Sequence, residues 1–169
     1  MQTPSFLSIQ LSGILLLLSI ITLDRNILMT AERKIFISAA IYGILGLVAG
    51  LFGRTYTHSM GMEDSNHLSV LHTHILALGL FFFLITLALE KVYALSSHRK
   101  LFSAFFWVYS VGLATTVVSM FAIGVIQANG GEESKALVGI SGLGHILITA
   151  GIIIYIATIN KALKTSPVK

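Results

Sequence analysis

The sequence predicts an all-α integral membrane protein, a single domain over residues 1–169 built from about five transmembrane helices. Of the 169 residues, 55% are hydrophobic and 11% are charged, whereas soluble domains carry about 25% charged residues. The apolar residues also form long uninterrupted blocks, which is the pattern of membrane helices rather than of amphipathic surface helices. Because the chain has no cysteine, disulfides, thiolate metal sites and covalently attached c-type haem are excluded.

Five apolar segments each approach the roughly 20 residues that cross a bilayer core. They cover residues 5–23, 35–53, 68–89, 101–127 and 137–160. The first segment lacks a basic start and a cleavage motif of small residues, so we interpret it as a first transmembrane span rather than a removed signal peptide. The short connections between segments predict that sequential helices pack antiparallel.

The basic residues predict the orientation of the bundle. Nine of the eleven Lys and Arg residues lie in the connections after the first and third segments and in the C-terminal tail. The other two, Arg54 and Lys135, lie on the opposite side of the predicted membrane. Since cytoplasmic loops are enriched in Lys and Arg, we expect the N-terminus outside and the C-terminus in the cytoplasm. The net charge of +4 comes from basic residues at the helix ends, and we therefore attribute it to membrane topology rather than to nucleic-acid binding.

Segment 35–53 carries a stripe of small residues along one helical face. Its members are Ala39, Gly43, Gly46, Gly50 and Gly53. Small residues let membrane helices approach closely, and we favour helix packing as the reason for the stripe. The alternative is that the glycines make room for a large planar ligand.

Segment 68–89 contains two histidines, His72 and His74, in a stretch otherwise suited to lipid. Ionisable side chains at membrane depth are costly and therefore indicate a functional site. Residues two apart on a helix point about 200° from each other, so the two rings cannot face one point. The face of His72 is smaller and more polar, which favours turning it inward. A central helix has neighbours on several sides, however, so either histidine remains a candidate ligand.

Two further candidate ligands are predicted at the depth of His74. With the orientation above, His74, Met120 and His145 lie about six, seven and eight residues from the outer ends of their helices. At 1.5 Å per residue, all three lie roughly 10 Å below the outer boundary. Ser141 precedes His145 by one helical turn and is expected to accept a hydrogen bond from its ring, as groups around ligating histidines usually do.

The outer loop between the second and third segments offers soft metal ligands. His58, Met60 and Met62 alternate along it, and His67 ends it. Such a set suits Cu(I). Arg54, at the outer end of the glycine-striped helix, is a candidate partner for a haem propionate, although a charge at a helix boundary needs no ligand to explain it.

The motifs Ser69-Val70-Leu71-His72-Thr73-His74 and Gly142-Leu143-Gly144-His145 resemble a family of small bacterial multi-spanning membrane proteins, a domain of unknown function. The resemblance covers about residues 34–161 and leaves out the first apolar segment. It implies a multi-pass protein of a bacterial cytoplasmic membrane. The placement of histidines in helices is similar, more loosely, to nitric-oxide-responsive membrane haem proteins and haem-copper oxidases, a likeness that carries no reaction with it.

We therefore expect a b-type haem near the outer face, with His145 as one axial ligand and His74 or His72 as the other. Met120 and Arg54 complete the set of candidate cofactor contacts. Such a protein would transfer electrons, sense haem or a gas, or handle haem, together with respiratory or haem-handling membrane proteins in the bilayer.

Two other functions are compatible with the sequence. In the first, a copper or zinc protein that assists metal transport or oxidase assembly would receive the ion at the outer-loop ligands and pass it to the paired intramembrane histidines. The second is a membrane zinc hydrolase, which needs three ligands and an activated water. No Asp or Glu lies at the depth of the histidines to act as its base, so enzymatic activity is left open.

Overall fold

The computed structural model describes residues 30–61 and 66–165, and within these ranges the chain is helical and contains no strand. Four helical rods there are long and apolar enough to cross a membrane. They are α2 (Ala31–Ser59), the second span (His67–Tyr93), α5 (Arg99–Ala128) and α6 (Lys135–Thr165). The predicted first helix, 5–23, lies outside the described residues. A fifth span and the orientation of the termini therefore stay predictions.

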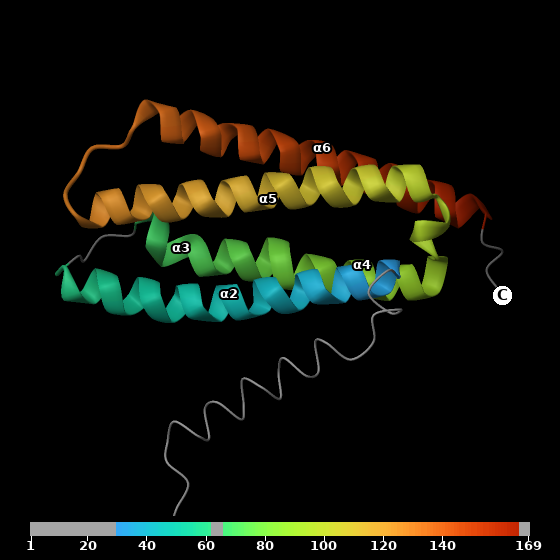
Figure 1. Ribbon diagram of the computed structural model, residues 1–169, viewed down its shortest axis with the longest axis horizontal. Coiled ribbons are helices and arrows are strands. Elements are labelled where there is room, and N and C mark those ends of the chain that lie inside the picture. Colours follow the sequence, from blue (N-terminus) through green and yellow to red (C-terminus); the bar gives the residue numbers. More distant parts are fainter. Residues whose placement is uncertain (1–29, 62–65, 166–169) are drawn as a thin grey trace, which may run out of the picture.

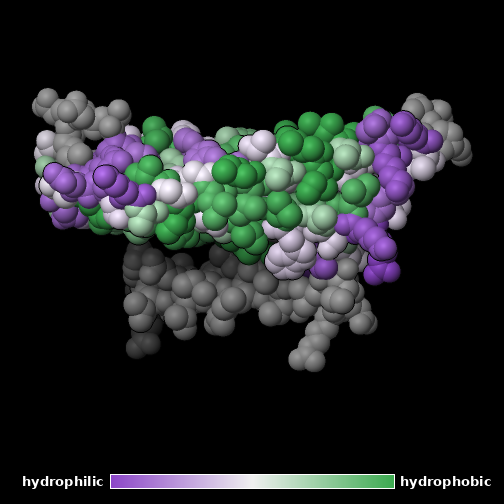
Figure 2. Space-filling view, turned by 90° about the horizontal axis from the view of Figure 1, so that it is seen from above, coloured by the Kyte–Doolittle hydropathy of each residue, from purple (hydrophilic) through white to green (hydrophobic). Residues whose placement is uncertain are grey.

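The second span is one rod made of three pieces. It begins as α3 (His67–His74), continues as the π-helix η2 (Ile75–Phe81) and ends as α4 (Phe82–Tyr93). A short 3₁₀ turn, η3 (Leu95–Ser97), then leads into α5. Figure 1 shows α2 beside the second span, α5 on the far side of that span, and α6 packed on α5. Hydrophobic residues form a belt around the middle of the bundle, and hydrophilic residues gather at its two ends (Figure 2).

The described helices extend beyond the predicted apolar segments, and polar side chains cap the starts of α2 and α3. The side chain of Thr30 accepts a hydrogen bond from the backbone N–H of Arg33 at the start of α2. Asn66 and Ser69 form a reciprocal capping box at the start of α3, which satisfies donors that a helix otherwise leaves free. Residues 54–59, predicted as outer loop, are instead the last turns of α2.

The small-residue stripe of α2 packs against the second span. The side chains opposite its glycines are Leu80 at Gly43, Leu76 at Gly46, His72 at Gly50 and Leu68 at Gly53. A Cβ at position 53 would lie 2.8 Å from the backbone oxygen of Leu68, closer than atoms tolerate. These contacts confirm helix packing as the role of the stripe, and side chains occupy the space that a planar ligand would need.

A second set of glycines brings α5 and α6 together. A Cβ at position 144 would lie 2.9 Å from the backbone nitrogen of Thr116 and 3.1 Å from the carbonyl oxygen of Gly112. A Cβ at position 151 would lie 2.9 Å from the Cα atom of Tyr109. Gly144 and Gly151 thus let α6 approach the backbone of α5 closely, with the side chain of Thr116 also in contact at Gly144, as small residues permit in membrane helices.

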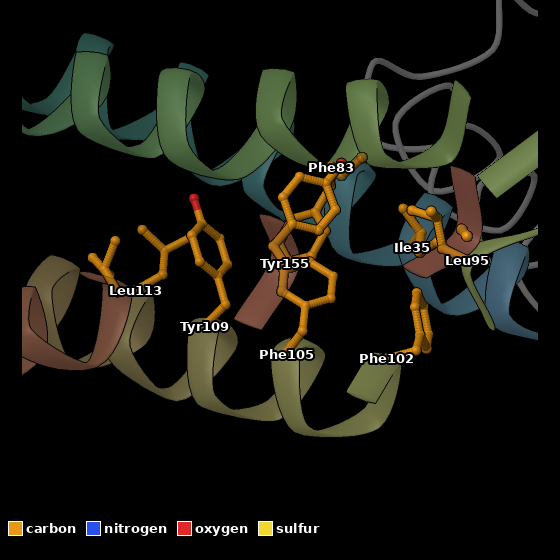
Figure 3. Packing of buried hydrophobic residues seen from close by; sticks show 11 residues of the cluster. Ile35, Phe83, Leu95, Phe102, Phe105, Tyr109, Leu113 and Tyr155 are labelled. Carbon is orange, nitrogen blue, oxygen red and sulfur yellow. The ribbon is translucent and has the colours of Figure 1, made fainter. Parts of the chain in front are cut away.

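The largest buried cluster lies between the four rods, toward the end where α2 and α5 begin. Figure 3 shows its labelled members: Ile35, Phe83, Leu95, Phe102, Phe105, Tyr109, Leu113 and Tyr155. The ring of Phe82 stacks on that of Tyr109 with centroids 4.2 Å apart. The hydroxyl oxygens of Thr86 and Tyr155 are 3.1 Å apart and hydrogen-bonded, which links α4 to α6. Aromatic packing with internally satisfied hydroxyls holds this half of the bundle together.

The contact at Gly144 predicts a sensitive position. Gly144→Ala places a methyl group against backbone atoms of α5 and is expected to destabilise the fold by about 1–3 kcal/mol, the usual cost of overpacking. Gly142→Ala is the matched control, because a Cβ there meets open space. Thermal unfolding in detergent, followed by circular dichroism, compares the two variants. Equal melting temperatures would contradict the close approach of α5 and α6.

Candidate functional site

His74 and His145 share one local geometry on two different helices. The Nδ1 atom of His74 is 3.1 Å from the carbonyl oxygen of Val70, and Nδ1 of His145 is 2.8 Å from the carbonyl oxygen of Ser141. A carbonyl oxygen only accepts hydrogen bonds, so Nδ1 is the donor in each contact, and a neutral ring of this tautomer has its lone pair on Nε2. Ser141 was predicted to be the partner of His145, and its backbone carbonyl has that role. Both rings therefore present Nε2 as a ligand atom.

Both histidines lie at one level along α5. Gly144, next to His145, packs at Thr116 of α5. Ile75, next to His74, packs in a buried cluster with Met120 of α5. Because Thr116 and Met120 are one helical turn apart, the two histidines have nearly the same depth in the bundle.

The face of α3 that carries His74 is turned toward α5. His67, two turns earlier on that face, bonds through its backbone N–H and its Nδ1 atom to the side-chain oxygen of Gln127, at 3.1 Å and 3.0 Å. Leu71, one turn earlier, packs in one cluster with Met120. Residues three, four and seven apart share a helical face, and Val70, four residues before His74, is 40% exposed. His74 therefore lies at the edge of the face that contacts α5.

His145 lies on the flank of α6 that borders the buried core. Ile148 is buried in the central cluster, and Ile152 packs against that cluster. These residues follow His145 at helical intervals of three and seven. The side chain of His145 is exposed and that of His74 is half-buried, so neither ring is enclosed by packing.

His72 points to a different neighbour. A Cβ at Gly50 of α2 would lie 3.5 Å from both Cβ and Cγ of His72, so this ring packs on the glycine stripe. The predicted divergence of His72 and His74 thus places one toward α2 and the other toward α5. Only the second of these faces lies on the side of the rod where α5 packs.

A π-helix begins directly after His74. The hydroxyl of Tyr109 donates a hydrogen bond of 2.8 Å to the carbonyl oxygen of Leu78 inside η2. Gly79 of η2 lies against the side chain of Tyr42 so closely that a Cβ would overlap it. π-helical turns occur frequently at functional sites. The sequence carried no local signal for this segment, whose tertiary contacts come from Tyr109 of α5 and Tyr42 of α2.

The end of the bundle where α2 ends and α3 begins, which is the predicted outer end, contains a polar chain that the sequence did not predict. The side-chain oxygen of Gln127 accepts from His67, and its amide nitrogen donates to the carboxylate of Glu133. Nearby, the amide of Asn129 donates to the hydroxyl of Tyr56 at 2.9 Å. These bonds tie α5 to α3 and to α2 above the level of His74.

The other candidate ligands are dispersed. Arg54 and His58 are exposed near the outer end of α2, and Met60, 44% exposed, is its C-cap residue. Met62 lies outside the described residues. Met120 is only 4% exposed and packs among leucine and isoleucine side chains. Across residues 30–61 and 66–165, no group of three His, Asp or Glu side chains gathers in a way that could hold a metal ion.

Comparison with known proteins identifies a family. A family model described as "Protein of unknown function (DUF2871)" matches residues 32–162. The chain belongs to this family. The DUF2871 match includes both histidine motifs and all four described spans, and it begins after the predicted first helix. No curated protein and no solved structure matches the chain.

The bond from Tyr109 to η2 predicts a measurable stability effect. Tyr109→Phe removes the donor to the Leu78 carbonyl and keeps the ring stacked on Phe82, so we expect a loss of about 0.5–1.5 kcal/mol. Tyr56→Phe is the control, since the hydroxyl of Tyr56 lies at the exposed outer end, where water can replace the lost bond. Denaturation of both variants in detergent measures the difference. An unchanged stability of Tyr109→Phe would mean that this hydrogen bond contributes nothing.

Proposed function

We propose that this membrane protein binds a b-type haem beside α5, with Nε2 of His74 and Nε2 of His145 as its axial ligands. The observation that supports the proposal is the matched pair of Nδ1–carbonyl hydrogen bonds, 3.1 Å and 2.8 Å long. Histidines that ligate metals characteristically bond their other ring nitrogen to a carbonyl or carboxylate. Two imidazoles that each leave Nε2 free for a metal would supply the axial ligands of a six-coordinate haem iron.

The surroundings of the two histidines suit such a group. The ligands come from different helices, as in other helical bundles that hold a cofactor in their core. The neighbouring buried side chains, Leu71, Leu113 and Ile148, are apolar. A structural zinc site usually needs four ligands, and a catalytic site needs three, whereas the proposed site uses two histidines.

His74 is the better partner for His145 than His72 is. The ring of His72 packs on Gly50 on the α2 side of the second span. His74 lies on the α5 side and has its Nδ1 atom already bonded to its own helix. We therefore assign His74 the ligand role and His72 a packing role.

A bound haem supplies one-electron redox chemistry within the membrane. In this chain, the carbonyl groups of Val70 and Ser141 would hold the imidazoles in one orientation and increase their basicity as ligands. Apolar side chains near the ligands would influence the reduction potential of the haem. These roles fit electron transfer, or the sensing or handling of haem or a gas, near the outer face of a bacterial cytoplasmic membrane. Respiratory or haem-handling membrane proteins are the proposed partners.

Absorption spectroscopy tests the haem proposal. The full chain, expressed with a supply of haem and purified in detergent, is expected to show a Soret band and sharp reduced α and β bands. His74→Ala and His145→Ala should each remove at least most of the bound haem, because each takes away one of two axial ligands. His72→Ala and His58→Ala are the controls and should keep it. A wild-type protein without a Soret band, or equal loss in the controls, would contradict the proposal.

Metal analysis of the same samples tests the copper or zinc alternative. Copper or zinc bound in stoichiometric amount to the haem-free wild type, and lost in a His58→Ala/Met60→Ala/Met62→Ala variant, would favour that function instead. Under the haem proposal this triple variant retains its full Soret band, since its three positions lie at the outer end of α2 and beyond.

A further inference from the structure

A groove lies at the end of the bundle opposite the outer polar chain, where α2 and α5 both begin. Its volume is about 770 Å³. The rim is formed by Lys34 of α2 and by Arg99 and Lys100 of α5, and all three side chains are exposed. Figure 2 shows hydrophilic residues gathered at this end of the bundle, on the right.

The groove has a positive electrostatic field. The first turns of both α2 and α5 contribute to it, and the N-terminal end of a helix carries a partial positive charge that favours anions. Within the described ranges, none of the three rim cations forms a salt bridge, because Lys91 and Glu32 make the one ion pair there, at 2.7 Å. The nearby carboxylate of Glu90 is buried and accepts hydrogen bonds from the backbone N–H and the hydroxyl of Ser96. Anions in the groove would therefore meet three cations whose charge is not locally neutralised.

The groove becomes apolar along α5, away from its charged rim. Phe102, Ala104, Trp107 and Val108 form this part of its wall. Trp107 is 63% exposed, and exposed tryptophans of membrane proteins concentrate at the boundary between headgroups and hydrocarbon. A charged rim followed by an apolar wall matches a molecule with a phosphate at one end and a hydrocarbon chain at the other.

We propose that this groove binds an anionic phospholipid, with its headgroup phosphate at Lys34, Arg99 and Lys100 and an acyl chain along Trp107. Basic residues at the membrane boundary attract anionic lipids, and an arginine guanidinium can donate two parallel hydrogen bonds to phosphate oxygens. A free phosphate ion would use the rim but not the apolar wall, so the wall favours the lipid. The site is remote from His74 and His145, and it does not depend on haem binding.

Trp107 reports on the groove directly, because it is the only tryptophan of the chain. The full chain is reconstituted in phosphatidylcholine vesicles that contain a minor fraction of phosphatidylglycerol, with bromine on the acyl chains of one lipid or the other. Bromine quenches a tryptophan that it contacts. We expect brominated phosphatidylglycerol to quench Trp107 about fivefold or more beyond its mole fraction, since several cations each add to the attraction.

Charge variants test the assignment. In the triple variant Lys34→Gln/Arg99→Gln/Lys100→Gln, quenching by brominated phosphatidylglycerol should fall to about what its mole fraction gives, so that the preference is lost. Lys34→Gln alone should reduce the preference partly. This single variant provides the test if the triple variant does not fold. Lys161→Gln/Lys164→Gln, which removes two charges at the end of α6, is the control and should keep the preference. The proposal is overturned if the three rim substitutions leave the preference unchanged or if the control loses it equally. It is also overturned if inorganic phosphate, replacing chloride at equal ionic strength, displaces the brominated lipid.

Discussion

Close backbone approach at glycines is the constraint on which the bundle depends. Lipid offers no hydrophobic force between helices, so packing and internal hydrogen bonds must hold them together. The glycines of α2 receive side chains of the second span, and Gly144 lets α6 touch α5 at Thr116. Because these contacts set how far each helix slides along its neighbour, they also bring His74 and His145 to one depth. The position of the candidate site follows from residues that take no part in its chemistry.

Local backbone groups then decide what each histidine offers. Val70 and Ser141 place a carbonyl one turn before His74 and His145, and each carbonyl holds the near ring nitrogen. His72 instead packs on Gly50. Two neighbouring histidines in one motif thereby acquire separate roles, one in helix packing and one as a ligand candidate, without any difference in their own chemistry.

The two ends of the bundle differ in their chemistry. The end where α2 ends and α3 begins joins its helices through amide, imidazole and carboxylate hydrogen bonds around Gln127. The other end carries the charged groove between α2 and α5 and, beside it, the aromatic cluster of Figure 3. The proposed haem site and the proposed lipid-binding groove would lie toward opposite ends of the bundle and act independently. The aromatic core would be a rigid element between them.

The sequence alone determined the all-α membrane character of the chain, the helical segments in the described ranges and the glycine stripe, because apolar length and residue spacing are local properties. The opposite directions of His72 and His74 also followed from helical spacing. Tertiary structure decided which direction faces which helix, since that depends on the register of α2 and α5 against the second span. The π-helix after His74, the helical state of residues 54–59 and the chain from His67 to Glu133 likewise depend on partners that are distant in sequence or on hydrogen bonds formed only in the folded bundle.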